Sequence, residues 1–252
     1  MKPVSTPKSL LSALASIGCL LLIWQMVAAS AASALLPTPA TVFAVMAHDV
    51  GSGQLPYHLG VTLARLAVSF LLSMSIGTAM GIALGRHSAL DRFFDSWLVI
   101  FLNIPALVTI ILCYIWLGLI ESAAIAAVVI NKLPNVIVTI REGTRNLDRN
   151  LLEMAEVYRF GRLKTLRHVI WPQLFPFVLT AARTGLALIW KIILVVELLG
   201  RSNGMGYQLH LFFQMFDVAG ILAYSIAFVI IVQLIEWTLL RPLDRMARNW
   251  RR

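Results

Sequence analysis

Four ionisable side chains lie within long apolar segments of the chain: Lys132, Arg183, Lys191 and Glu197. Charged groups are costly in such segments and usually face a cavity or a partner. Arg183 and Lys191 are eight residues apart, so on a helix they share one face about two turns apart. Two cations on one face could attract an anion such as a sulfonate, nitrate or carboxylate. Glu197 points elsewhere, towards an external gate or a helix partner.

Two uncharged residues could belong to the same path. Trp190, next to Lys191, could line it, although a Trp in an apolar segment more often serves packing. Asn103, together with Pro105, could break a helix where it lines a cavity, or form an ordinary kink. For the four charged residues the alternative is structural, namely pairing at a subunit interface or snorkelling to lipid head groups. Both interpretations stay open.

Motifs that would indicate catalysis are missing from the sequence. It contains no GxxxxGK[ST] phosphate loop, no HExxH, no GxSxG and no paired-Cys metal site. The histidines have no ligand spacing, and Cys19 and Cys113 each lie in an apolar run. We therefore predict neither an enzyme nor a bound metal or cofactor. Any energy source must be an ion gradient or another subunit.

The composition indicates a membrane protein. Apolar residues make up 59% and charged residues 13% of the 252 residues, and the mean hydropathy is +0.82. No Asp, Glu, Lys or Arg occurs in residues 9–48, 66–85, 96–120 or 218–235, and about 20 apolar residues suffice to span a bilayer. This excludes a disordered chain or a soluble enzyme. The net charge of +9 suits basic cytoplasmic loops better than a nucleic-acid partner.

The apolar segments predict an all-α polytopic fold with about six transmembrane helices. The expected domain covers residues 10–240, with a cytoplasmic N-terminus at 1–9, a loop at 141–171 and a basic tail at 241–252. The expected spans are residues 10–36, 59–84, 97–119, 122–140, 172–199 and 218–240.

Basic residues predict that both termini are cytoplasmic. Only Arg201 then lies on the opposite side, and the cytoplasmic segments hold Lys2, Lys8, Arg86, Arg92, Arg141, Arg145, Arg149, Arg159, Arg162, Lys164, Arg167, Arg241, Arg245, Arg248, Arg251 and Arg252. The start of the chain also resembles a signal peptide with a small-residue cleavage site near residues 28–33. Its apolar run is longer than a typical signal core, which favours retention.

Two shorter patterns predict local structure. Gly77, Gly81 and Gly85 line one helix face and would let a neighbouring helix approach closely. In the external segment, Thr38 could cap a short surface helix in which Pro39 is the first residue.

The loop at 141–171 reads as two short helices. Asn150 can cap the first, with Glu153 as its capping-box partner. Leu151, Ala155 and Tyr158 then form an apolar stripe at i, i+4 and i+7. Such a stripe suits either a protein partner or packing on the chain's own cytoplasmic surface.

Two residues mark the ends of this loop. Gly161 suits the position after the first helix, and Pro172 suits the first turn of the fifth span.

The segment EMAEVYRFGRLKTLRHVIWPQLFP resembles the EAA loop of permease subunits in bacterial binding-protein-dependent ABC importers. The most similar group handles nitrate, sulfonates and taurine. Glu153, Ala155 and Pro172 match the pattern, and Val169 matches its Ile approximately. The departures are Met154 for the first Ala, Trp171 for the Leu, and Arg159 at the usual Gly position.

The resemblance continues along the chain in the right order. It includes PTPATVF, VTLARLAVSF with Arg65, NIPALVTIILCYIWLGL, LPNVIVTIREG, AARTGLALIWKIILVVELLG and NGMGYQL. Leu117 stands where the family tends to have Phe.

This resemblance implies a type I importer permease of the bacterial inner membrane. The partners it implies are a second permease copy, a separate ATPase subunit pair carrying ATP and Mg, and an external solute-binding protein. The loop helix would couple the ATPase to transport of a small anionic solute. Two rivals remain: a stand-alone secondary transporter or channel that uses the intramembrane charges, and a membrane anchor that recruits a cytoplasmic partner.

Overall fold

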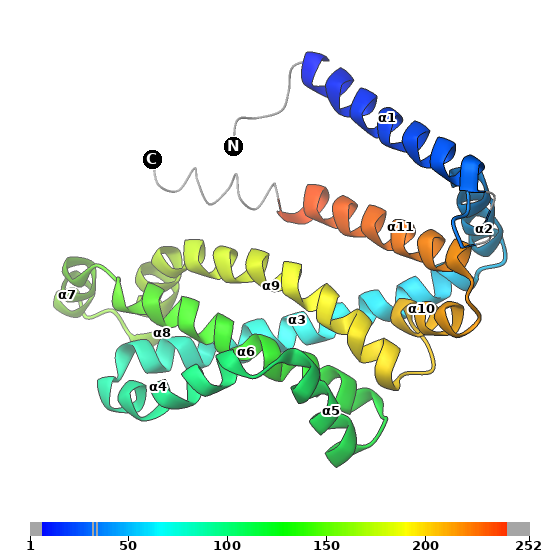
Figure 1. The fold of residues 1–252 in the computed structure, drawn as a ribbon. Helices are drawn as coiled ribbons and strands as arrows, with labels where there is room; N and C mark the ends of the chain where they lie inside the picture. Colours follow the sequence, from blue (N-terminus) through cyan, green and yellow to red (C-terminus); the bar gives the residue numbers. More distant parts are fainter. Residues whose placement is uncertain (1–6, 32, 34, 241–252) are drawn as a thin grey trace.

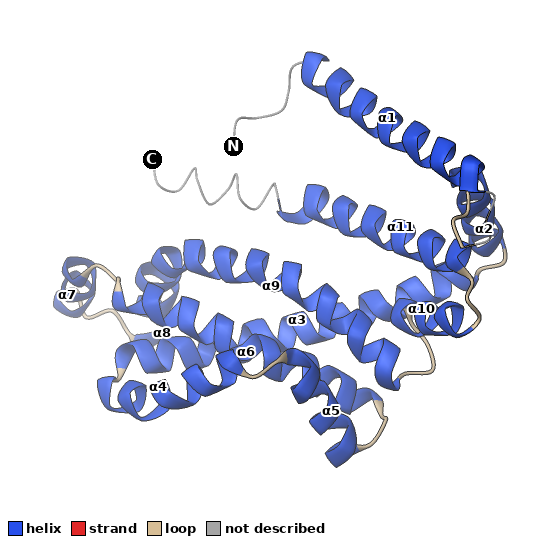
Figure 2. Ribbon diagram, in the orientation of Figure 1, coloured by secondary structure: helices blue, strands red, loops and turns tan. Residues whose placement is uncertain are grey.

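A computed structural model describes residues 7–31, 33 and 35–240 of the chain. Within these residues the chain is helical and has no strand (Figures 1 and 2). The predicted all-α class is therefore confirmed. Most of the predicted N-terminal segment, and all of the basic tail at 241–252, lie outside the described residues.

The elements follow one another with short connections. Their order is α1 (Pro7–Ala31), α2 (Pro39–Gly51), α3 (Gln54–Arg86), α4 (Ser88–Asn103), α5 (Ala106–Leu117), α6 (Glu121–Arg145), α7 (Arg149–Val157), α8 (Arg162–Thr165), a π-helical segment (Leu166–Ile170), α9 (Trp171–Gly200), α10 (Met205–Gln214), α11 (Val218–Ile235) and a second π-helical segment (Glu236–Leu240).

The core is formed by α3, α6 and α9, which run alongside one another (Figure 1). Gly77, Gly81 and Gly85 face α6, as the small-residue pattern predicts. A Cβ added at Gly77 or Gly81 would lie only 2.6 or 2.7 Å from side-chain atoms of Val136 or Ile140. The missing side chains therefore allow α3 and α6 to pack closely, and we call this contact the glycine ladder.

In the part of the chain that the structure describes, four helices are long and apolar enough to cross a membrane: Gln54–Arg86, Glu121–Arg145, Arg162–Gly200 and Val218–Thr238. The apolar part of α1, Ala15–Ala31, is shorter. The predicted third span, 97–119, is broken where Asn103 and Pro105 left a break or a kink open: α4 and α5 meet at an angle of 98°. Pro105 removes a backbone donor and keeps Ile104 extended, with φ −70° and ψ 124°.

The two ends of the bundle differ. At one end lie α7 and α8, and at the other lie α2 and α10 (Figure 1); we call them the α7 end and the α10 end. Thr38 caps α2, and its side chain accepts a hydrogen bond from the Thr41 N–H. Pro39 is in the first turn, so this sequence prediction is confirmed.

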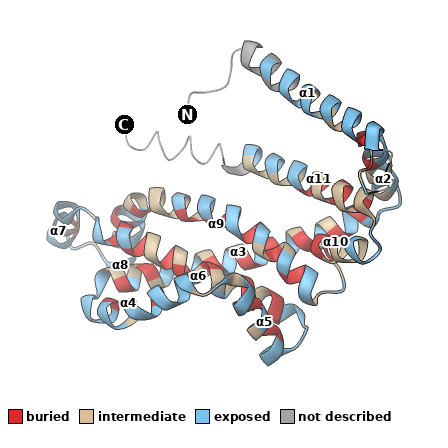
Figure 3. Cartoon of the chain, in the orientation of Figure 1, coloured by how far each residue is buried: buried red, intermediate tan, exposed pale blue. Residues whose placement is uncertain are grey.

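Much apolar surface remains uncovered in the single chain. Helix α1 lies apart from the core and is exposed along most of its described length (Figure 3). Leu20, Leu22 and Met26 on α1 are all more than half exposed. Such a surface suits lipid or another subunit better than water.

Candidate functional site

The loop between α6 and α9 forms the helix that the sequence indicates, with a different cap. Asp148, and not Asn150, precedes α7, and its carboxylate accepts the Asn150 N–H at 2.8 Å. The prediction was wrong by two residues because Asp is as good a cap as Asn. Position N3 is then Leu151, so Glu153 is not placed for a capping box.

The apolar face of α7 is also turned from the predicted one. Leu151 and Tyr158 are exposed as expected, but Ala155 is buried, with 1% of its surface accessible. Met154 and Val157 are exposed and complete an arc on the outer side of the helix. We call Leu151, Met154, Val157 and Tyr158 the α7 apolar face.

The end of α7 is a Schellman motif with an arginine in the special position. Arg159 has φ +51°, its N–H donates to Glu156 O at 2.9 Å, and the Phe160 N–H donates to Ala155 O at 2.8 Å. Gly161 was predicted to follow the end of the helix; it has φ −65° and is instead the N-cap of α8. Arg159 therefore holds the left-handed conformation at the position where the EAA pattern has glycine.

Helix α7 is tied to the start of α9. The Asp148 N–H donates to Gln173 Oε1 at 2.8 Å, and Pro172 lies in the first turn of α9 as predicted. The helical path nevertheless begins before Pro172, because α8 and the π-helical segment continue into α9. The π-helical turn lies just before Pro172, which has no N–H and crowds the preceding turn. A movement of α7 would thus reach α9 directly.

A cluster of ion pairs joins α4 to α6 at the α7 end. Arg141 contacts Asp91 at 3.1 Å and Asp95 at 2.7 Å. Arg145 also pairs with Asp91 and lies 3.0 Å from Glu142. This cluster fixes the start of α4 against the end of α6.

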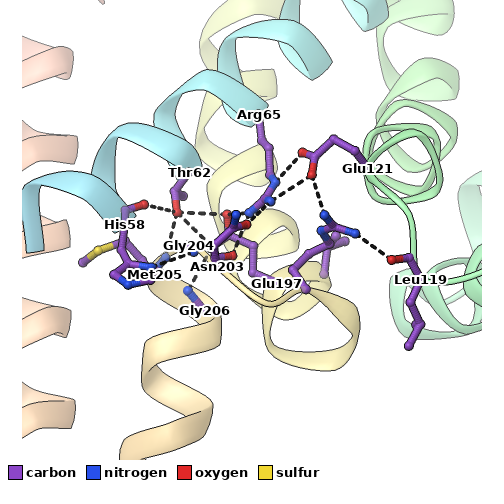
Figure 4. A network of polar contacts seen from close by, with 12 residues as sticks. His58, Thr62, Arg65, Leu119, Glu121, Glu197, Asn203, Gly204, Met205 and Gly206 are labelled. Atoms are coloured by element: carbon purple, nitrogen blue, oxygen red, sulfur yellow. Dashed lines mark hydrogen bonds and ion pairs between the residues drawn. The ribbon is translucent and has the colours of Figure 1, made fainter. Parts of the chain in front are cut away.

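The α10 end holds a larger buried polar network, drawn in Figure 4. Arg65 on α3 lies at its centre. Its guanidinium contacts Glu197 at 2.7 Å, Glu121 at 2.5 and 2.9 Å, and the carbonyl oxygen of Asn203 at 2.9 Å. It also donates to the Asn203 side chain. Arg201 contacts Glu121 at 2.8 Å, so two cations balance two carboxylates.

Backbone groups at the start of α10 complete this network. The Gly206 N–H donates to Glu197 at 2.9 Å and the Met205 N–H donates to Thr62 Oγ1 at 2.8 Å. Gly204 has φ +108°, a conformation that favours glycine, and its N–H donates to His58 at 3.0 Å. Glu197 is thus a partner of α3 and of the α10 N-terminus, and it is fully buried.

Sequence reasoning missed Thr62, Glu121 and Asn203, and it noted Arg65 only within the family resemblance. A signal was present on α3. His58, Thr62, Arg65, Ser69 and Ser73 are spaced three or four residues apart in an otherwise apolar helix, and all five are buried.

The remaining path residues are not brought together at one point. Lys132 is buried between helices, and Trp190 is buried edge-on to Phe228. Arg183 and Lys191 are exposed on α9. Asn103 is exposed at the break between α4 and α5, where its amide donates to Val99 O at 2.7 Å.

Comparison with known proteins identifies the family of this chain. Residues 73–237 match the family described as binding-protein-dependent transport system inner membrane component. The chain belongs to this family.

Several relatives align with most of the length of this chain. A putative aliphatic sulfonates transport permease of Bacillus subtilis is 29% identical over 91% of this chain and 83% of its own length. Its counterpart in Escherichia coli is 30% identical over 73% and 71%. The taurine transport system permease of Escherichia coli is 25% identical over 77% and 70%.

Solved structures share the fold. A structure of the MetNI methionine ABC transporter, described as inward facing, has a TM-score of 0.63 at 20% identity and covers 76% of this permease and 93% of that chain. The family match contains α7, the π-helical segment and α9. It begins after Thr62 and Arg65, so the Arg65 side of the network lies outside it.

Proposed function

We propose that this permease is the membrane subunit of an ABC importer and that a separate ATPase subunit drives it through α7. The α7 apolar face carries this proposal. It is exposed on a short helix that Asp148 and the Schellman motif terminate firmly, and an apolar helix face of this kind suits a groove on a partner. ATP and Mg would bind to the ATPase pair, and this chain would hold no cofactor and catalyse no reaction.

The two ends of the bundle then take opposite sides of the bacterial inner membrane. We assign the α7 end, with its many basic residues, to the cytoplasm, together with both termini. The α10 end would face the external solute-binding protein. A second permease copy would cover exposed apolar surface that lipid does not, and no nucleic acid takes part.

The solute we propose is a small anion of the sulfonate, taurine or nitrate type. Relatives bear the names of aliphatic sulfonate and taurine transporters, and one is named a nitrate import permease. The exposed face of α9 carries Lys191 and Arg183 together with Thr180 and Thr184. This face can line a path that favours anions over cations.

Coupling is tested with two matched substitutions. Val157 on α7 and Leu163 on α8 are both 79% exposed, so Asp at either position costs little in packing. Val157→Asp should abolish co-purification of the ATPase subunit in mild detergent and lower solute-stimulated ATP hydrolysis at least tenfold. An unpaired carboxylate would enter an apolar groove there. Leu163→Asp should leave both measurements near the wild-type values.

Ala155→Asp is a poorer test, because Ala155 is buried and a carboxylate at this position would disrupt the fold itself. If the ATPase co-purifies equally with wild type and Val157→Asp, α7 is not the coupling helix. If the wild-type chain is recovered alone under conditions that keep other membrane complexes intact, the importer assignment fails.

A further inference from the structure

Lys132 is a buried cation that the mechanism above does not use. It lies near the middle of α6 and has only 1% of its surface exposed. Among the described residues, none forms a hydrogen bond or ion pair with its ammonium group. Burying an ammonium without a partner is costly, so a sequence that keeps one has a compensating use for it.

No carboxylate on the surrounding helices can reach it. Helix α3 contains no Asp or Glu. On α6, Glu121 and Glu142 lie 11 and 10 residues away, and on α9 Glu197 is 12 residues from Gly185, which Lys132 touches. At 1.5 Å per residue these separations are roughly 15–18 Å. All three carboxylates already contact arginines.

Gly185 on α9 makes room for the lysine side chain. A Cβ at position 185 would lie 2.7 Å from Lys132 Cε and 3.4 Å from Nζ. The aminobutyl chain therefore crosses α9 at this glycine. Ser69 Oγ, Arg141 Nε and Arg201 Nε are the fully enclosed polar atoms without a hydrogen bond in the described part of the chain, and the Lys132 ammonium is not among them. Its tip thus retains the little exposure that the residue has.

Ser69 on α3 supplies a second unsatisfied donor near the same level. The glycine ladder pairs Gly77 with Val136, so one turn earlier on both helices Ser73 and Lys132 lie at one level. Side chains on a helix lean towards its N-terminus, which carries the ammonium towards the level of Ser69. Ser69 Oγ is buried with no partner, and Ser73 Oγ donates to Ser69 O at 2.7 Å.

We propose that Lys132 and Ser69 bind one small oxyanion between α3, α6 and α9. An ammonium group has three donors and no acceptor, and the serine hydroxyl adds another donor. These groups fit the oxygens of a sulfonate, nitrate or carboxylate. The inference rests on the proposed function in one respect, since it identifies the anion as the charged group of the transported solute.

The test uses the full permease purified with its ATPase subunit. Its thermal unfolding is followed as sodium methanesulfonate or sodium nitrate is added at constant ionic strength. Wild type should show a saturable rise in Tm, and Lys132→Met, which keeps an unbranched side chain without the ammonium group, should show none. Lys164→Met removes an exposed lysine from α8, outside the proposed path, and should keep the rise.

Ser69→Ala keeps the test decisive if Lys132→Met unfolds. Loss of one hydrogen bond should raise the half-saturating methanesulfonate concentration about tenfold. An unchanged response in Ser69→Ala and in Lys132→Met, or no response in wild type, overturns the site. Because the ATPase still co-purifies in those cases, the proposed function would stand.

Transport distinguishes the source of the anion. Uptake by reconstituted complexes with the binding protein should fall at least tenfold in Lys132→Met if the site holds the solute. A lost Tm response with unchanged uptake would instead identify a site for a free inorganic anion and overturn the assignment to the solute.

Discussion

Arg65 forms ion pairs with both carboxylates of the network at the α10 end. It is almost fully buried, as is Glu197, whereas Glu121 is 47% exposed. A buried pair of this kind contributes little net stability against an apolar replacement of both partners, but loss of one partner leaves an uncompensated charge. The two carboxylates that meet Arg65 are thus unequal, because only Glu121 can regain solvation from water.

Arg65→Met should therefore destabilise the permease by about 3–5 kcal/mol. Glu121→Gln should cost far less, because this side chain is half exposed and Arg65 keeps Glu197. Unfolding in detergent, followed by the loss of helical signal, measures both. Equal stability of Arg65→Met and wild type would show that the network does not hold α3, α9 and α10 together.

At the scale of residues, the sequence predicted the positions of important side chains better than it predicted their roles. It placed α7 within a few residues and marked Glu197 as a helix partner or gate. It chose Asn150 as the cap where the structure has Asp148, because Asp and Asn are both good caps. It also placed Gly161 at the helix end, because glycine is the usual residue with positive φ. Arg159 takes that conformation because the Schellman hydrogen bonds require it there.

At the scale of elements, the glycine ladder sets the geometry of the core. A Cβ at Gly81 would lie 2.9 Å from the backbone oxygen of Ile137 as well as against the Ile140 side chain. A backbone atom cannot move aside as a flexible side chain can. The α3–α6 contact is consequently intolerant of even small additions.

Gly81→Val should force the two helices apart and lower stability by about 3 kcal/mol. Gly60→Val is the matched control on the same helix, because nothing lies within 4 Å of a Cβ added there. Folded yield from membranes and thermal unfolding in detergent should both distinguish the two variants. Comparable losses in both would mean that the ladder is not a tight contact.

Small-residue spacing predicted this contact, and the Thr38 cap with Pro39 predicted the α2 helix, because both depend on local sequence. The break between α4 and α5 was only one of two readings of Asn103 and Pro105. Proline removes a hydrogen bond wherever it stands, but the angle that results depends on tertiary partners. Here the Arg141 cluster holds α4 against α6, and no pattern within α4 and α5 encodes that.

At the scale of the whole molecule, the chain has two chemically different ends. Exposed basic residues of α8 and the following turn gather at the α7 end, and the balanced Arg65 network occupies the α10 end. The order of helices along the chain, with α3 and α6 parallel in the ladder, requires that Ser88 and Ser202 lie at opposite ends. Both serines are exposed.

Ser88→Cys and Ser202→Cys should therefore react with a membrane-impermeant maleimide from opposite sides. The measurement is labelling of spheroplasts before and after lysis, with Cys19→Ser and Cys113→Ala removing the native thiols. We expect Ser202→Cys to react in intact spheroplasts and Ser88→Cys only after lysis. The reverse pattern would contradict the assigned orientation.

The glycine ladder also has a mechanical consequence. Two helices in backbone-to-backbone contact behave as one rod, and the 33 residues of α3 give it a length of roughly 50 Å. One end of the rod bears Arg65 and the other lies beside the Arg141 cluster. A tilt imposed at either end is then a tilt of the whole, as in a lever. Communication across the membrane would need no chain of side chains changing rotamer in turn.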